Sequence, residues 1–302
     1  MTMDVGRAET ATVAQSRDLS VVVPALWQLT KPGVTRLVVV TMLCGALAAP
    51  GQLEVTRLIV TLLGMSLVVA GANALNMYLE RDVDALMVRT RVRPIPSGRL
   101  APESALAFGV LVSVVGLVVQ SVFVSPLVSL LSSLALLSYV LVYTPLKRVT
   151  PLSLYVGALP GAIPPLIGWA AQTGELSARA WVMFAILFVW QVPHFLAISI
   201  FRRDDYARAG LRVSSSVHGQ RATAQAVLVS SVALVAVSLL PVAAGMAGLA
   251  YVVVAGAVGA CFFGWAVRGL RPEIDRRWAR TLFFASMPYL VIVFGALVLS
   301  AP

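Results

Sequence analysis

The sequence predicts an all-α, polytopic membrane protein, and three observations support this fold class. First, 59% of the 302 residues are hydrophobic and 12% are charged, whereas soluble domains carry about a quarter charged residues. Second, the chain contains repeated apolar runs close to the ~20 residues that a helix needs to cross the hydrocarbon core. Third, 21 of the 23 lysines and arginines fall in five short segments, as expected of cytoplasmic loops between spans.

Nine apolar segments are predicted to be transmembrane helices, in a chain whose mean hydropathy is +0.89. With nine spans, Arg57 and Arg179 are the two basic residues left on the far side of the membrane. The positive-inside rule therefore places the N-terminus in the cytoplasm and the C-terminus outside the inner (plasma) membrane. The predicted spans cover residues 34–50, 55–78, 104–122, 126–143, 152–171, 180–200, 222–242, 246–267 and 281–300.

The first 20 residues are polar and lack the apolar core of a signal peptide. We expect residues 1–20 to be retained and disordered, and residues 21–302 to form a single domain. The formal net charge of +10 lies mostly in short loops between spans, so it reflects topology and excludes a nucleic-acid-binding protein. Cys44 and Cys261 lie in apolar spans without metal-ligand spacing, which favours small buried hydrophobes.

A row of polar residues begins at the end of the second predicted span. Asn76, Glu80 and Asp84 are spaced four residues apart, so they share one face of a helix, whereas Asp82 points the opposite way. Carboxylates on one face repel each other near hydrocarbon unless a cation compensates. Neighbouring arginines could neutralise them, but converging oxygen ligands also suit Mg²⁺, which fills its shell with substrate phosphate and water.

A second polar stretch follows the sixth span. Asp204, Asp205 and Tyr206 lie among several arginines, and a solvated loop would also account for this pattern. Both acidic stretches are nevertheless predicted on the same side of the membrane. Two acidic sites that face one cavity could hold metal on either side of a diphosphate.

Basic residues accompany both acidic stretches. Lys147 and Arg148 follow the fourth span, and Arg89 and Arg93 follow the first acidic stretch. Membrane topology alone would explain most of these charges. Beside a metal–diphosphate complex, however, they would stabilise the negative charge on a departing diphosphate.

Two further features lie inside the spans. The segment GALPGAIPPLIGW, residues 157–169, is unfavourable for a straight helix and predicts either a cavity lining or a kinked packing helix. His194 follows Pro193 late in the sixth span. It could be a hydrogen-bonded structural residue, an iron ligand or a proton carrier.

These motifs resemble the UbiA superfamily of intramembrane prenyltransferases, and in particular its haem-farnesylating branch. The resemblance implies nine helices around a central cavity and Mg²⁺-dependent transfer of a farnesyl group from farnesyl diphosphate to a vinyl group of protohaem IX (haem B). The product, haem O, would serve haem-copper oxidase assembly. The matching stretches are LTKPGVTRLVVVTMLCG (29–45), AGANALNMYLERDVDALMVRTRVRPIPSGRLAP (70–102), YTPLKRVTPLSLYVGALPGAIPPLIGWAAQTG (143–174) and WQVPHFLAISIFRRDDYARAG (190–210).

The pattern and the resemblance together assign roles to individual residues. The predicted metal ligands are Glu80, Asp84 and Asp205. The predicted catalytic residues are Asn76, Glu80, Asp84, Lys147 and Asp205, and the predicted substrate-binding residues are Arg89, Arg93, Arg148, His194, Asp204 and Tyr206.

The sequence departs from the family pattern at two places. Position 80 is Glu where the family usually has Asp, which lengthens the ligand by one methylene. Residues 211–220, LRVSSSVHGQ, replace an apolar, proline-containing stretch with a polar one. The polar stretch 211–220 could change the lid over the active site and the choice of acceptor.

The expected partners are farnesyl diphosphate, haem B and the lipid bilayer, together with haem A synthase or oxidase assembly proteins, and no nucleic acid. One alternative is a prenyltransferase of the same superfamily that uses an aromatic quinone precursor. Another is a membrane transporter, which typically carries internal repeats and ionisable residues deep in its spans. Here the charges gather at one face and no repeat is evident.

Overall fold

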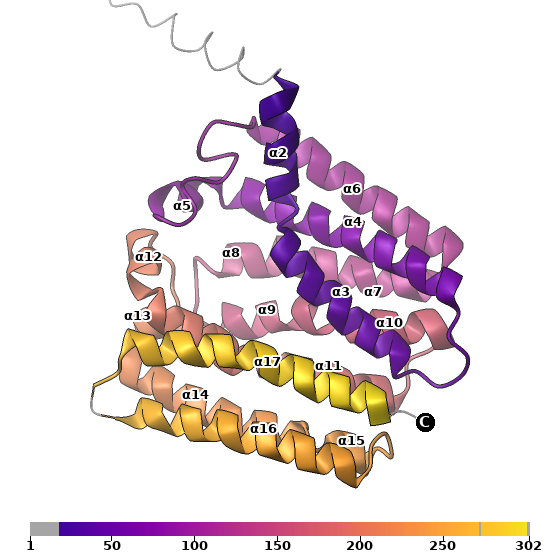
Figure 1. The fold of residues 1–302 in the computed structure, drawn as a ribbon. Helices are drawn as coiled ribbons and strands as arrows, with labels where there is room; N and C mark the ends of the chain where they lie inside the picture. Colours follow the sequence, from indigo (N-terminus) through magenta and orange to yellow (C-terminus); the bar gives the residue numbers. More distant parts are fainter. Residues whose placement is uncertain (1–17, 272, 301–302) are drawn as a thin grey trace, which may run out of the picture.

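The computed structural model describes residues 18–271 and 273–300, and these residues form helices and connecting turns without a β-strand (Figure 1). The elements are α2 (Leu19–Leu29), α3 (Pro32–Leu47), α4 (Val55–Leu79), α5 (Arg81–Leu86), α6 (Pro102–Phe123), α7 (Pro126–Leu137), a π-helix (Ser138–Tyr143), α8 (Thr144–Leu146), α9 (Ser153–Ala162), α10 (Pro164–Thr173), α11 (Ala178–Phe201), α12 (Arg203–Arg208), α13 (Ser214–Val217), α14 (Gly219–Val237), α15 (Leu240–Ala243), α16 (Leu249–Val267), a 3₁₀-helix (Arg268–Leu270) and α17 (Arg276–Ser300).

The helices agree with the predicted spans. Within the described residues, eight helical segments are long and apolar enough to cross a membrane, and they match the second to ninth predicted spans. The first predicted span, 34–50, corresponds to the 16-residue helix α3. The all-α membrane fold is therefore confirmed, and the count of nine agrees with eight long helices plus α3.

The short apolar helix α2 was not predicted. Its N-cap is Asp18, whose side chain accepts a hydrogen bond from the backbone N–H of Ser20 at 2.9 Å. The disorder predicted for residues 1–20 falls mainly on residues 1–17, which lie outside the described part of the chain. Leu19 and Ser20, the last two residues of the segment predicted to be disordered, begin α2.

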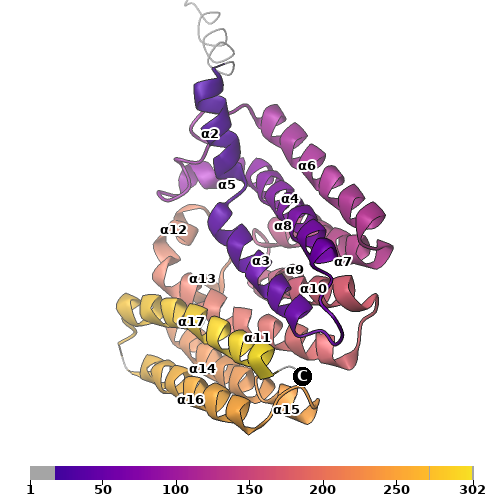
Figure 2. The ribbon, with the colours of Figure 1, turned by 45° about the vertical axis from the view of Figure 1, so that its right-hand side comes forward.

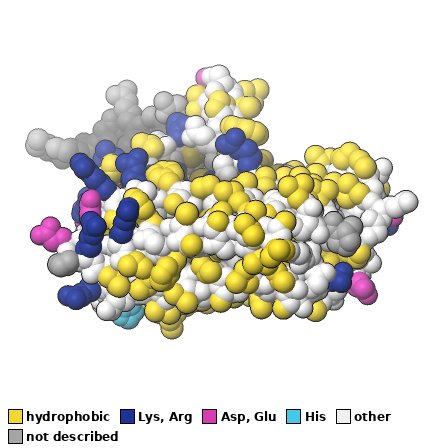
Figure 3. Space-filling model, turned by 60° about the horizontal axis from the view of Figure 1, so that its bottom comes forward, with side chains coloured by type: hydrophobic (Ala, Val, Ile, Leu, Met, Phe, Trp, Pro, Cys, Tyr) yellow, Lys and Arg dark blue, Asp and Glu magenta, His cyan; other side chains and the backbone are white. Residues whose placement is uncertain are grey.

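The surface is that of a protein embedded in a bilayer. The long helices run side by side, and the short helices α5, α12 and α13 lie at one end of the bundle (Figures 1 and 2). Hydrophobic side chains cover the middle of the face in Figure 3, and basic side chains gather at one end. Helix α6, for example, exposes Leu111, Val114, Val118 and Val122. Such a continuous apolar surface fits lipid rather than water, and the protein is a multi-pass membrane protein.

Small residues allow the helices to approach closely, as membrane helix packing requires. Helix α3 crosses α10 at Gly45 and Gly168. A Cβ atom on Gly45 would lie 2.1 Å from the Pro165 carbonyl oxygen, and one on Gly168 would lie 1.9 Å from the Met42 carbonyl oxygen. Any larger residue at either position would therefore push the two helices apart.

The proline-rich segment 157–169 interrupts the fifth span at Ile163, whose backbone keeps helical dihedral angles of φ −67° and ψ −30°. Helix α9 ends at Ala162, and α10 begins at Pro164. Prolines cannot donate to the preceding turn, so carbonyl groups near the break need other partners. The buried amide of Gln191 on α11 donates to the Ala158 carbonyl at 2.9 Å. This side-chain bond ties α9 to α11.

Candidate active site

The first acidic stretch lies where α4 passes into α5. Glu80 is the residue between the two helices and leaves helical geometry, with φ −98° and ψ 8°. The backbone nevertheless keeps helical spacing, because Glu80 N–H donates to the Asn76 carbonyl and Asp84 N–H donates to the Glu80 carbonyl. Asn76, Glu80 and Asp84 therefore share a buried face, at 2%, 4% and 0% exposure. Asp82 points outward, as the sequence predicted.

Each buried carboxylate has its own cation. Lys147, after α8, places Nζ 2.7 Å from Glu80 Oε1, and Arg93 places Nη1 2.5 Å from Asp84 Oδ2. The other oxygen of Asp84, Oδ1, is buried and has no hydrogen-bond partner among the described residues. A buried, unpartnered carboxylate oxygen is costly unless a ligand completes its environment. The structure thus leaves one oxygen of Asp84 free for a ligand.

Lys31 joins this group, although it was not among the residues selected from the sequence. Its Nζ donates to Asn76 Oδ1 at 2.9 Å, and Asn76 Nδ2 donates to Thr144 Oγ1 at 3.2 Å. Lys31 also has φ +46°, a left-handed conformation that no other non-glycine residue adopts in the described chain. Backbone strain of this kind often marks functional positions. The signal available in the sequence was a lysine directly before the proline that begins α3.

We call Lys31, Asn76, Glu80, Asp84, Arg93 and Lys147 the charged cluster. It contains three cations against two carboxylates.

The charged residues of the cluster shift one another's pKa values. Burial lowers the pKa of Lys31 to about 7, and the positive charges of Arg93 and Lys147 lower it as well. Burial alone would raise the pKa of Glu80, but the adjacent ammonium of Lys147 holds it below its ordinary value. Although burial lowers the pKa of Lys147, its contacts with Tyr143 and Glu80 raise it above the ordinary value. The Glu80–Lys147 pair therefore stays ionised, whereas Lys31 is poised to change charge near neutral pH.

The end of the fourth span carries Lys147 into the cluster. Residues Ser138–Tyr143 form a π-helix, a feature often found at functional sites. Lys147 Nζ lies 5.4 Å from the centre of the Tyr143 ring, within cation–π range. The ring packs where Gly157 has no side chain, because a Cβ there would lie 2.5 Å from it.

The predicted arginines separate into two groups. Thr90 Oγ1 donates to the Asp84 carbonyl at 2.9 Å and Arg93 N–H donates to the Thr90 carbonyl, which folds the loop so that Arg93 returns to the cluster. Arg148 instead binds exposed Asp82, with both contacts at 2.7 Å, and this pairing lowers the pKa of Asp82. Arg89 is exposed and makes no ion pair within the described residues. The structure does not bring Arg89 or Arg148 into the cluster.

The second acidic stretch forms the short helix α12 beside α5. Tyr206 packs against buried Val83 of α5, against Met87 directly after α5 and against Leu211, so an apolar contact holds the two acidic stretches next to each other. Asp205 is partly buried and pairs with Arg202 and Arg208. Asp204 instead points toward the start of α17 and pairs with exposed Arg276 at 2.6 Å.

The three predicted metal ligands do not form a site by themselves. In residues 18–271 and 273–300, no three carboxylate, histidine or cysteine side chains are close enough to hold a metal ion. Glu80 and Asp84 nevertheless present hard oxygen atoms, and Oδ1 of Asp84 has no hydrogen-bond partner among the described residues. Mg²⁺ characteristically binds one or two carboxylates together with substrate phosphates. The first acidic stretch therefore fits Mg²⁺ that arrives with a diphosphate.

The polar segment 211–220 is ordered against the end of α11. Ser215 is 1% exposed, and its hydroxyl donates to the Ser199 carbonyl. Leu211 is buried with α5 and Tyr206. The segment is thus anchored through Leu211 and Ser215, while Arg212 and residues 216–219 are exposed.

His194 lies on α11 and makes no hydrogen bond to the charged cluster. It is 7% exposed, and its Nδ1 lies 2.7 Å from the hydroxyl oxygen of Ser286 on α17. Its ring stacks on Trp190, with ring centres 4.7 Å apart. The structure therefore provides the hydrogen bond expected of a structural histidine and leaves Nε2 without a partner among the described residues.

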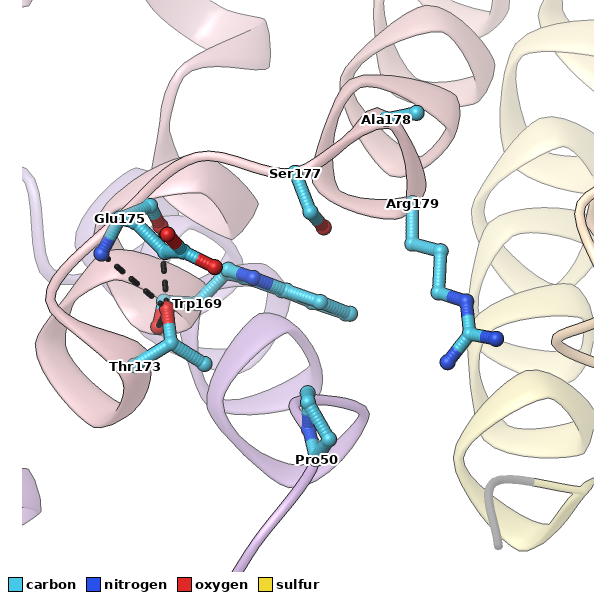
Figure 4. A pocket seen from close by; sticks show the side chains of 7 residues that line it. All are labelled: Pro50, Trp169, Thr173, Glu175, Ser177, Ala178 and Arg179. Atoms are coloured by element: carbon cyan, nitrogen blue, oxygen red, sulfur yellow. Dashed lines mark hydrogen bonds between the residues drawn. The ribbon is translucent and has the colours of Figure 1, made fainter.

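A pocket of about 300 Å³ lies at the opposite end of the bundle (Figure 4). It contains none of the residues predicted for the site. It lies at the start of α11, and Asp204 and Asp205 follow the end of this 24-residue helix, roughly 36 Å away at 1.5 Å per residue. This pocket is therefore separate from the charged cluster. Its lining residues are Pro50, Trp169, Thr173, Glu175, Ser177, Ala178 and Arg179.

The chain belongs to the UbiA prenyltransferase family, whose model matches residues 37–287. It is 53% identical to the protoheme IX farnesyltransferase of Sorangium cellulosum over 245 residues, which is 81% of this chain and 88% of that protein. It is 49% identical to the protoheme IX farnesyltransferase of an Anaeromyxobacter species over 90% of this chain and 92% of the relative.

Solved structures share the fold at low sequence identity. A digeranylgeranylglyceryl phosphate synthase aligns with a TM-score of 0.77 at 16% identity, over 92% of this chain and 98% of that one. A UbiA homologue from Archaeoglobus fulgidus, bound to GPP and Mg²⁺, aligns with a TM-score of 0.63 at 12% identity, over 90% of this chain and 99% of that one. These similarities confirm the UbiA fold.

Proposed function

We propose that this protein transfers a farnesyl group from farnesyl diphosphate to a vinyl group of haem B and so forms haem O. The observation that carries this proposal is the charged cluster, which lies at one end of an apolar helix bundle and contains more cations than carboxylates. Such a cluster suits a diphosphate, and the surrounding bundle suits its apolar chain. The high identity to protoheme IX farnesyltransferases across most of the chain supports haem as the acceptor.

The proposed reaction begins when the bond between farnesyl C1 and the diphosphate oxygen breaks. The diphosphate leaves with the electron pair, and Lys31, Lys147 and Arg93 stabilise its charge. The vinyl group then attacks the allylic cation, water adds to the resulting cation beside the porphyrin, and a proton is released. The apolar bundle keeps other water away from the allylic cation until the acceptor has reacted.

Glu80 and Asp84 would hold Mg²⁺ together with the diphosphate. The bound ion would supply additional positive charge to the leaving group. Asn76 positions Lys31 through its side-chain oxygen. Asp205 and Tyr206 lie on α12 beside α5, and we propose that they complete the diphosphate site from the second acidic stretch.

The direct test uses purified protein in lipid nanodiscs with farnesyl diphosphate, Mg²⁺ and haem B. Mass spectrometry should detect haem that has gained a farnesyl group and a hydroxyl group. Mesohaem, which has ethyl groups in place of vinyl groups, is the matched control and should give no product. Prenylation of an aromatic quinone precursor, with haem B left unchanged, would instead establish the alternative acceptor.

We further propose a bacterial inner-membrane location, with the charged cluster on the cytoplasmic side. In a variant without Cys44 and Cys261, a cysteine at exposed Ser97 should resist a membrane-impermeant thiol reagent added to intact cells. A cysteine at exposed Gln52, at the other end of the bundle, should react. The reverse labelling pattern would overturn this orientation. Haem A synthase or oxidase assembly proteins, as consumers of haem O, are proposed partners that co-purification would identify.

Glu80→Asp should retain turnover within about threefold, because the carboxylate and its charge remain and the flexible Lys147 side chain can follow it. The current contact is 2.7 Å. Initial rates of haem O formation at saturating substrates would test this expectation. Loss of activity in a folded Glu80→Asp protein would show that the site depends on the longer side chain.

Lys31 should make diphosphate binding depend on pH. With a pKa of about 7 in the free protein, Lys31 is mostly neutral at pH 8, and a bound diphosphate favours its protonated form. Binding should therefore take up close to one proton at pH 8, and affinity should fall as the pH rises above 7. Calorimetry in buffers with different ionisation enthalpies would measure the uptake.

Lys31→Arg is the matched control for this linkage. Arginine keeps its charge throughout the range, so the variant should bind diphosphate without proton uptake and with little change in affinity between pH 7 and pH 9. The same uptake in Lys31→Arg as in the wild type would assign the proton to another group.

A further inference from the structure

Aromatic rings fix the plane of His194. One face stacks on Trp190, with centres 4.7 Å apart and an interplanar angle of 26°, and Phe283 of α17 lies 4.5 Å away at 36°. Phe195 adds an edge contact at 5.5 Å. The imidazole therefore has little freedom to rotate, and its chemistry depends on what each ring nitrogen meets.

The hydrogen bonds of Ser286 determine which nitrogen carries the proton. The Ser286 hydroxyl oxygen lies 2.6 Å from the Phe283 carbonyl oxygen and 2.7 Å from His194 Nδ1. A carbonyl can only accept, and a serine hydroxyl has one hydrogen to donate. Since that hydrogen goes to Phe283, the hydroxyl oxygen accepts a hydrogen bond from Nδ1–H. Neutral His194 then has an unprotonated Nε2 with a free lone pair.

A second hydrogen bond fixes the position of Ser286 relative to His194. Trp190 Nε1 donates to the Ser286 carbonyl at 2.6 Å, so α11 and α17 are joined through both the backbone and the side chain of Ser286. Turning the imidazole over would replace Nδ1 with a carbon atom and break its hydrogen bond. The direction of the Nε2 lone pair is therefore fixed by hydrogen bonds between α11 and α17.

We propose that Ser286 is a positioning residue that orients His194 Nε2 as an axial ligand of the haem iron. The proposal rests on the proposed function, which makes haem the acceptor. Histidines that bind metals usually donate their second ring N–H to a protein acceptor, which fixes the tautomer and the ring. Nε2 donates its lone pair to iron without proton transfer or change of oxidation state. One axial bond would fix the rigid porphyrin, and hence its vinyl groups, relative to the farnesyl chain.

The test compares haem binding and resonance Raman spectra of purified wild type, His194→Ala, Ser286→Ala and Ser286→Thr. Ferrous haem in the wild type should show an iron–histidine stretching band. Ser286→Ala should weaken haem binding about 10- to 100-fold and move the band to lower frequency. Ser286→Thr keeps a hydroxyl that can bond the preceding turn and should retain the wild-type band. Farnesyl diphosphate affinity should be unchanged in all of these variants.

Two controls separate positioning from folding. Ser231→Ala removes another fully buried serine hydroxyl, whose bond goes to the Val227 carbonyl of its own helix, and should leave the band unchanged. His194→Ala should lose the band and regain an iron–imidazole band when imidazole is added, which a misfolded protein would not do.

An unchanged band in either His194→Ala or Ser286→Ala would overturn the proposal. So would a wild-type protein that binds haem without an iron–histidine band, and both results would leave haem as the acceptor. A wild-type protein that binds farnesyl diphosphate but no haem would overturn this proposal together with the proposed acceptor.

Discussion

Asp84→Asn should lower turnover by at least about 1000-fold, which corresponds to roughly 4 kcal/mol of lost transition-state stabilisation. The substitution preserves shape but removes the charge that would hold Mg²⁺ with the diphosphate. It also removes the negative charge that pairs with Arg93, whose Nη1 lies 2.5 Å from Asp84 Oδ2. Single-turnover measurements with farnesyl diphosphate and haem B would give the effect on the chemical step.

Asp82→Asn is the matched control for Asp84→Asn. Asp82 lies two residues away and also pairs with an arginine, but its side chain is 63% exposed and faces away from the charged cluster. It should retain turnover within about twofold, since exposed ion pairs contribute little. Thermal unfolding in detergent would show whether Asp84→Asn remains folded. Near-normal haem O formation by folded Asp84→Asn would remove this carboxylate from the mechanism.

Lys147→Met should lower turnover by about 100- to 1000-fold, the typical cost of removing one group that stabilises developing negative charge. Methionine keeps much of the side-chain volume but leaves Glu80, which is 4% exposed, without its nearest cation. We expect a smaller effect on the affinity for farnesyl diphosphate than on turnover, because the negative charge increases as the diphosphate leaves. Rates and affinities measured on the same preparation would separate the two effects.

Arg148→Met tests whether turnover requires Lys147 itself or only positive charge near the membrane surface. Arg148 follows Lys147 in the chain but binds Asp82 and the Leu79 carbonyl on the outer side of the α4–α5 junction. Turnover should stay within about threefold of the wild type, and Lys147→Arg should recover most of the activity that Lys147→Met loses. Equal losses in Arg148→Met and Lys147→Met would indicate a general electrostatic effect rather than a contact with the leaving group.

The sequence determined those properties that depend on neighbouring residues along the chain. Apolar runs gave the membrane class and the positions of the spans, because crossing hydrocarbon requires a continuous stretch of apolar side chains. The four-residue spacing of Asn76, Glu80 and Asp84 gave their common face. That face survives the end of α4 at Leu79, because two backbone hydrogen bonds preserve the helical spacing.

The tertiary structure decided which charges meet. From the sequence, all three arginines were predicted to bind substrate: Arg89, Arg93 and Arg148. The fold of the loop around Thr90, however, brings Arg93 to Asp84 and leaves Arg89 exposed. Arg148 pairs with Asp82, which lies 66 residues earlier in the chain. Local pattern carries no information about such pairings, because helix packing and the interruptions between helices set them.

The same distinction applies to Lys31 and His194. Lys31 reaches Asn76, 45 residues later, because α3 packs beside α4, and His194 reaches Ser286, 92 residues later, because α11 packs beside α17. The sequence identified the histidine by its position in a membrane span but could not identify its partner or the nitrogen left free. Those features depend on side-chain hydrogen bonds between helices that are distant in the chain, and such bonds form only when the whole bundle is packed.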